Sequence, residues 1–195
     1  MERVSATLTD KIMSWGRYDS ECREEIHYAI SIFLWDSLTL LLSLMAVYAL
    51  WGEMKPALLF AFCFAVLRQF SGGIHAQTHV QCLVSTIAVF VLGSVLQKAL
   101  HPMLVYAMGG MAVVGVWILS PLENSKKHFT LAQRRRYRRV AHQILLFESI
   151  LAVISGAMDA QLAGAVSMAI VMVFALQVME KMTKDEMKKG EISFV

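Results

Sequence analysis

The chain has 195 residues, of which 57% are hydrophobic and 17% charged, and its formal net charge is +3. Long apolar runs separated by brief polar segments exclude an ordinary soluble domain. Apolar and polar residues do not alternate along these runs, which excludes a membrane β-barrel, so the sequence predicts an all-α, polytopic integral membrane protein.

Residues 1–30 are polar and of mixed charge. They lack the basic patch followed by a short apolar core that marks a secretory signal, so we expect a cytoplasmic N-terminal segment with no cleavable signal. Two interpretations of this segment remain open: a solvated leader, or a short amphipathic helix on the membrane surface. The residues that would form such a helix are Lys11, Ile12, Met13, Trp15 and Tyr18.

Six apolar runs follow. A helix needs about 20 largely apolar residues to cross the hydrocarbon core of a bilayer. We expect spans near residues 32–50, 54–70, 83–99, 103–120, 144–158 and 160–179. The second contains Cys63, and the fifth is short and contains Glu148, so either could be tilted or re-entrant and the expected number is five to six. Residues 1–195 then form a single membrane-embedded domain, with residues 180–195 as a cytoplasmic tail.

Basic residues are divided unequally between the two faces of the predicted six-span arrangement. Lys55 and Lys98 fall on one face, and the other 16 of the 18 lysines and arginines fall on the opposite face. Loops rich in these residues stay in the cytoplasm. We therefore expect both termini, and the segment between the second and third spans, on the cytoplasmic side of the membrane.

The segment SGGIHAQTHVQC, residues 71–82, joins the second and third spans. Thr78 followed by Gln81 matches a capping box, so the third helix is expected to begin there. Cys82 would then lie in the first helical turn, where free N–H groups and the positive end of the helix dipole favour the nucleophilic thiolate. In a reducing compartment, we expect Cys22 to be an incidental exposed thiol and Cys63 a core residue, with no disulfide framework.

His75 is the expected general base for Cys82. On one continuous helix, these residues would be separated by about 10.5 Å along the axis, too far for a hydrogen bond. A Cys-His dyad therefore requires a broken helix, which Gly72 and Gly73 allow because glycine reaches positive φ without a steric penalty. Their backbone N–H groups could also stabilise an oxyanion. The sequence thus predicts that Cys82 attacks a carbonyl carbon while His75 takes and returns the proton.

Other polar residues allow competing interpretations of this segment. Asp36, one turn inside the first span, is the candidate acid for orienting His75, and Glu148 is a less well placed alternative. Zinc binding by His75, His79 and Cys82 would need both histidines on one helix, which contradicts the predicted helix start, and the H-E-x-x-H pattern is missing. We therefore expect no metal and no other cofactor.

Two stretches resemble the accessory gene regulator B (AgrB) family of membrane cysteine peptidases. RQFSGGIHAQTHVQC, with Gly-Gly-x-His-Ala and a cysteine seven residues after the histidine, is similar to that family's signature. SPLENSKKHFTLAQRRRYRRVA resembles its basic cytoplasmic loop, although ENSKKH differs from the Asn-Lys-Pro motif that is more usual in the family. The resemblance extends from about residue 22 to residue 180 and implies a location in the bacterial cell membrane.

The resemblance also implies a substrate and a reaction. The substrate would be an AgrD-like precursor of a quorum-sensing signal peptide, with an amphipathic leader, a central signal region and an acidic C-terminal tail. Cleavage before the tail would leave the signal region as a thioester on Cys82, and a cysteine or serine within that region would then close a thiolactone or lactone ring. The catalytic pair would be Cys82 and His75.

A cluster of basic residues precedes the fifth span. Its ordinary roles are to fix topology and to contact anionic lipid headgroups, and holding the acidic tail of the precursor is compatible with both. The residues assigned to tail binding are Lys126, Lys127, Arg134, Arg135 and Arg136. Besides the precursor and the lipid bilayer, a homodimer remains open as a partner, and no nucleic acid is expected. The alternative to a peptidase is a non-catalytic membrane transporter or scaffold in which the Gly-Gly-His stretch is a hinge.

Overall fold

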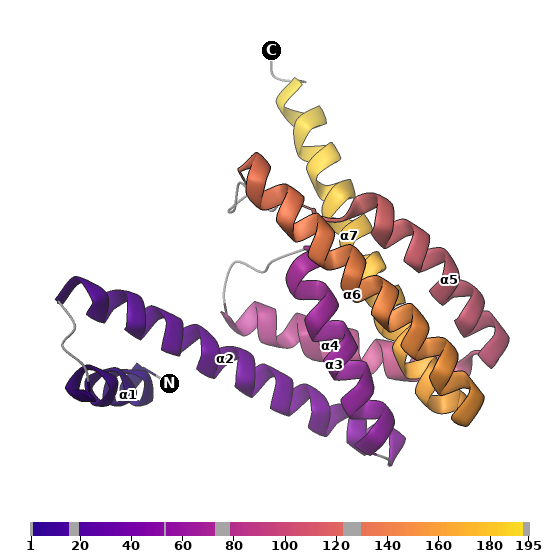
Figure 1. Ribbon diagram of the computed structural model, residues 1–195, viewed down its shortest axis with the longest axis horizontal. Coiled ribbons are helices and arrows are strands. Elements are labelled where there is room, and N and C mark those ends of the chain that lie inside the picture. The colour runs from indigo at the N-terminus through magenta and orange to yellow at the C-terminus, as the bar shows by residue number, and fades with distance from the viewer. Residues whose placement is uncertain (1, 16–19, 53, 73–78, 123–129, 193–195) are drawn as a thin grey trace.

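A computed structural model describes residues 2–15, 20–52, 54–72, 79–122 and 130–192 (Figure 1). In these ranges the chain forms seven α-helices and no strand. They are α1 (Glu2–Trp15), α2 (Ser20–Trp51), α3 (Met54–Ser71), α4 (His79–Ala99), α5 (Pro102–Leu119), α6 (Leu131–Met158) and α7 (Ala160–Ile192). The predicted all-α fold is therefore confirmed.

Within the described residues, six helices are long and apolar enough to cross a membrane. The candidate spans are Ile26–Ala49, Met54–Ser71, Val80–Ala99, Pro102–Leu119, Leu131–Met158 and Ala160–Asp185. They agree in number and order with the six predicted spans. The protein is thus a multi-pass membrane protein.

The fifth of these helices begins much earlier than predicted. Helix α6 continues without a break for 28 residues, whereas the apolar run predicted a start near residue 144. Thr130 and Gln133 form a reciprocal capping box, in which each side chain accepts a hydrogen bond from the other's backbone N–H, at 3.3 and 3.1 Å. This cap starts the helix before the arginine-rich turn, and arginine is a good helix former. The helix is therefore long enough for a full crossing.

Helix α7 is the central helix of the bundle and packs against α3, α4, α5 and α6 (Figure 1). Every residue from Ala163 to Val173 is buried. Helices in a membrane associate through close van der Waals packing, which small residues permit. For example, a Cβ atom on Gly109 of α5 would lie only 2.9 Å from the Cβ atom of Ser167.

Aromatic packing fixes α4 against α3. Phe90 of α4 contacts Phe60 and Phe64 of α3 edge-on, with ring centroids 5.0 and 5.2 Å apart, and all three side chains are buried. Such arrangements bring the positive ring edge to the negative ring face. This contact joins the middle of α4 to the middle of α3.

The N-terminal segment is helical rather than an irregular leader. Helix α1 packs on α2, where Ser5 Oγ lies 3.0 Å from His27 Nε2 and Arg23 donates a hydrogen bond to Asp10 at 2.8 Å. The opposite face exposes an apolar stripe of Val4, Leu8 and Ile12. This amphipathic pattern is typical of a helix at a membrane surface, which remains the prediction for its location. Tyr18 and the side chain of Trp15 lie outside the described residues.

Candidate active site

The end of α3 and the end of α5 meet at Gly72 and Leu122. Gly72 has a φ of 79° and forms an isolated parallel bridge with Leu122. The Leu122 N–H donates a hydrogen bond to the Ser71 carbonyl oxygen at 3.0 Å. A Cβ atom on residue 72 would collide with the carbonyl group of Leu122. Gly72 is therefore required both by its left-handed backbone conformation and by this close approach.

Gln177 of α7 lies beneath this junction. Its Nε2 atom donates hydrogen bonds to the Ser71 carbonyl oxygen at 2.9 Å and to Ser120 Oγ at 3.0 Å. The side chain is fully buried. Sequence reasoning missed this residue, although an amide inside an apolar span is a recognisable signal of an internal polar contact.

Cys82 is a free, half-buried cysteine in the first turn of α4. Arg68, in the last turn of α3, interacts electrostatically with Cys82 and with Glu180 of α7. Its guanidinium carbon lies 5.7 Å from the centroid of the Phe64 ring. Sequence reasoning counted Arg68 only among the basic residues of the cytoplasmic face, although an arginine within an apolar span signals a specific partner.

The basic start of α6 lies beside the end of α3. Tyr137 contacts Phe70, with ring centroids 6.0 Å apart. The neighbouring arginines are exposed, among them the predicted tail-binding residues Arg134, Arg135 and Arg136. These arginines therefore lie at the same end of the bundle as the C-terminal end of α3, which Gly72 follows.

Several predicted site residues lie outside the described part of the chain. They are His75 and Gly73, the cap residue Thr78, the basic residues Lys126 and Lys127, and the side chains of Cys22, Asp36 and His79. The Cys-His dyad, the orienting acid and the oxyanion role of Gly73 therefore stay predictions. The Gly72 N–H, the other proposed oxyanion donor, donates a hydrogen bond to the Arg68 carbonyl oxygen at 3.2 Å. Helix α4 does begin at His79, directly after the predicted cap. Among the described residues, no three histidine, cysteine, aspartate or glutamate side chains could hold a metal ion together.

Glu148 is far along the bundle from the end of α3. It is buried in α6 and interacts with Cys63, which lies eight residues, or about 12 Å, before the end of α3. Neither carboxylate oxygen has a hydrogen-bond partner among the described residues. Cys63 is fully buried, as expected for a core residue. Because His75 lies outside the described residues, the role of Glu148 in orienting it stays a prediction.

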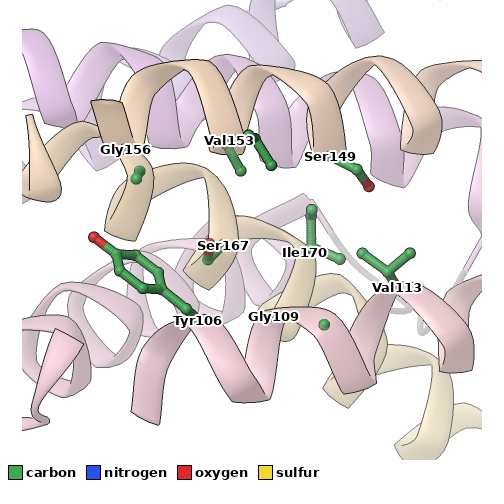
Figure 2. A pocket seen from close by; sticks show the side chains of 11 residues that line it. Tyr106, Gly109, Val113, Ser149, Val153, Gly156, Ser167 and Ile170 are labelled. Atoms are coloured by element: carbon green, nitrogen blue, oxygen red, sulfur yellow. The ribbon is translucent and has the colours of Figure 1, made fainter. Parts of the chain in front are cut away.

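A cavity of about 480 Å³ opens between α5 and α6 and is floored by α7 (Figure 2). Its lining is mostly apolar and contains many small residues. Examples are Gly109 and Val113 of α5, Ser149 and Gly156 of α6, and Ser167 of α7. Neither Cys82 nor Gly72 lines it, so the cavity is separate from the candidate active site.

The fold and the site define an all-helical multi-pass membrane protein with a cysteine at the start of one span. Comparison with known proteins agrees with this description. The family described as Accessory gene regulator B matches residues 5–180. Because the match covers most of the chain, the protein belongs to the AgrB family and has a role in the accessory gene regulator system.

Curated relatives carry the same family name at low identity. The chain is 26% identical over 167 residues to an AgrB-like protein of Clostridium perfringens (strain SM101), covering 79% of this chain and 78% of the relative. It is 25% identical over 193 residues to an AgrB-like protein of Halalkalibacterium halodurans, covering 98% and 96%. No solved structure matches the chain significantly.

Proposed function

We propose that this AgrB family member is a membrane cysteine endopeptidase that removes the acidic C-terminal tail from an AgrD-like signal-peptide precursor and promotes cyclisation of the signal. The observation that carries the proposal is the position of Cys82, in the first turn of α4 and within electrostatic range of Arg68. The first turn of a helix and a nearby cation are surroundings in which cysteine nucleophiles are commonly found. The relatives' names and the family match agree with this role.

The proposed reaction has two acyl-transfer steps. The Cys82 thiolate attacks the carbonyl carbon at the end of the signal region, and His75 delivers a proton to the departing amine of the tail. The peptide bond breaks, the tail leaves with a new N-terminus, and the signal region remains as a thioester. A cysteine or serine of the signal region then loses its proton to His75 and attacks the thioester. The new ring ester or thioester forms as the bond to Cys82 breaks.

The arginines of α6 are proposed to hold the acidic tail during the first step. Arg134, Arg135 and Arg136 are exposed and lie on the helix that contacts the end of α3 through Tyr137. Coulomb attraction between these cations and an acidic peptide needs proximity rather than a defined sequence. Binding there would bring the bond before the tail toward the start of α4.

Replacement of the nucleophile tests the proposal. In full-length protein in lipid vesicles, Cys82→Ala should abolish cleavage of an AgrD-like precursor but leave precursor binding unchanged, because the covalent step is lost and the binding surface is not. Cys63→Ser is the matched control, since Cys63 is also a free cysteine within a span, and it should keep most of the activity. A covalent adduct between wild-type Cys82 and the truncated signal peptide should be detectable by mass spectrometry. Full cleavage by Cys82→Ala would show that Cys82 is not the nucleophile, and absence of cleavage by the wild-type protein would favour the transporter or scaffold alternative.

A further inference from the structure

We infer that Gln177 is a positioning residue of the proposed peptidase, one that holds the starting points of two loops in a fixed relative position. The first loop follows Gly72 and contains His75, and the second follows Leu122 and contains Lys126 and Lys127. This inference rests on the proposed function, because it concerns how the same site is assembled.

The contacts of Gln177 connect three helices at one point. Its Nε2 atom is bonded to the Ser71 carbonyl oxygen, at the end of α3, and to the Ser120 hydroxyl, directly after α5. The Ser71 carbonyl oxygen also accepts the Leu122 N–H. One carbonyl group therefore receives a donor from the central helix and a donor from the chain that leaves α5.

The energetics indicate a role other than general stability of the bundle. A fully buried amide inside a span has a substantial desolvation cost, and an apolar side chain of similar size would avoid it. Gln177 Oε1 and Ser71 Oγ are both buried and have no hydrogen-bond partner among the described residues.

The hydrogen bonds of Gln177 affect where the catalytic groups lie relative to one another. The position and direction of the chain at Gly72 constrain where His75 can lie, and the chain at Leu122 constrains the second loop in the same way. Nucleophile, base and bound peptide must meet within narrow limits, and a displacement of about 1 Å can reduce a rate roughly 100-fold. Loss of the Gln177 hydrogen bonds should therefore impair the chemical step more than binding.

Gln97 of α4 provides a matched control. Its Nε2 atom donates a hydrogen bond to the Gln161 carbonyl oxygen of α7 at 2.9 Å, and its Oε1 atom is also buried without a partner in the described residues. It lies at the opposite end of α4 from Cys82. Gln177→Leu and Gln97→Leu thus each remove one glutamine that donates a hydrogen bond to a backbone carbonyl oxygen. Gln177 is fully buried and Gln97 is half-buried.

The experiment compares both variants as full-length protein in lipid vesicles, with an AgrD-like precursor that the wild-type protein cleaves as substrate. Gln177→Leu should lower the single-turnover cleavage rate at saturating precursor at least tenfold, with precursor affinity changed less than threefold. Gln97→Leu should stay within twofold of the wild type on both measures. Hydrogen exchange should become faster in peptides covering residues 71–78 and 120–129 of Gln177→Leu, while the spans of α5 and α7 keep their protection.

Other results would overturn the inference. It is wrong if Gln177→Leu cleaves at the wild-type rate, or if affinity, span protection and rate fall together, since that pattern marks a general loss of structure. Ser120→Ala, which removes one acceptor and leaves the Ser71 contact, should show a smaller decrease in rate than Gln177→Leu if Gln177 acts as inferred; no decrease would contradict it. Failure of the proposed function would appear separately, as cleavage by Cys82→Ala, and the hydrogen-exchange result does not depend on catalysis.

Discussion

At the scale of single residues, Gly72 combines two requirements that a larger residue cannot meet. Its positive φ is shared by Gly52, after α2, where φ is 71°. The two glycines differ in their surroundings, because a Cβ atom at residue 52 would meet no atom within 4 Å, whereas at residue 72 it would meet the carbonyl of Leu122. Comparing the same substitution at both glycines therefore separates the effect of backbone strain from the effect of a collision with Leu122.

We predict that Gly72→Ala lowers precursor cleavage at least tenfold, because alanine both strains the left-handed backbone and forces Leu122 away. Gly52→Ala has the same strain, about 1–2 kcal/mol, without the collision, and should keep cleavage within twofold of the wild type. Cleavage by each variant in vesicles, at equal amounts of folded protein, measures the difference. Equal effects of the two substitutions would show that the contact with Leu122 does not matter for catalysis.

The residues missed from the sequence, Gln177 and Arg68, have partners that are far away along the chain. Gln177 is separated from Ser71 by 106 positions and from Ser120 by 57, so no local pattern indicates their contact. The start of α4, the position of Cys82 in its first turn and the positive φ of Gly72 could be predicted, because capping and glycine conformation are local properties. The tertiary contacts that fix them are not local.

At the scale of helices, the sequence predicted the number and order of the spans but not the extent of α6. Apolar length locates the part of a helix that lipid can cover, and this signal located all six spans. It does not locate a helix end in water, where caps and helix propensity decide. Thr130 and Gln133 carried that signal in the sequence, and the charged turn that follows them obscured it.

The basic turn of α6 leads to a prediction about charge. Replacing Arg134, Arg135 and Arg136 together with glutamine should weaken precursor processing, and the defect should grow as salt screens the remaining positive charge. Replacing Lys55 and Lys98 with glutamine is the control, because both lie on the face predicted to be outside the cell. Processing rates at several salt concentrations provide the measurement, after both variants are shown to keep their orientation. Unchanged processing by the arginine variant would assign these residues to lipid contact and topology alone.

At the scale of the whole molecule, six full crossings would place α1 and the end of α7 on the same side of the membrane. The positive-inside rule predicts that this side is cytoplasmic. In a background without native cysteines, cysteines at Arg139 and Lys181 should resist a membrane-impermeant maleimide in intact cells, whereas one at Lys98 should react. All three positions are exposed, so accessibility in the folded protein does not limit labelling. Labelling of a cysteine at position 139 or 181 from outside would show that the orientation is the reverse of the predicted one. The candidate site would then lie outside the cell.

The unbroken length of α6 has a consequence for substrate size. Its 28 residues extend about 42 Å, while the hydrocarbon core is about 30 Å thick, so roughly 12 Å of rigid helix remains to carry the arginine turn beyond the lipid. The contact between Tyr137 and Phe70 holds this projecting part against α3. If α4 is held as firmly against α3, the separation between Cys82 and the arginines proposed to bind the tail is nearly constant. If both act on one peptide, the number of residues between its scissile bond and its acidic group is limited by that separation, and precursors with a shorter or longer spacer would be poor substrates whatever their signal sequence.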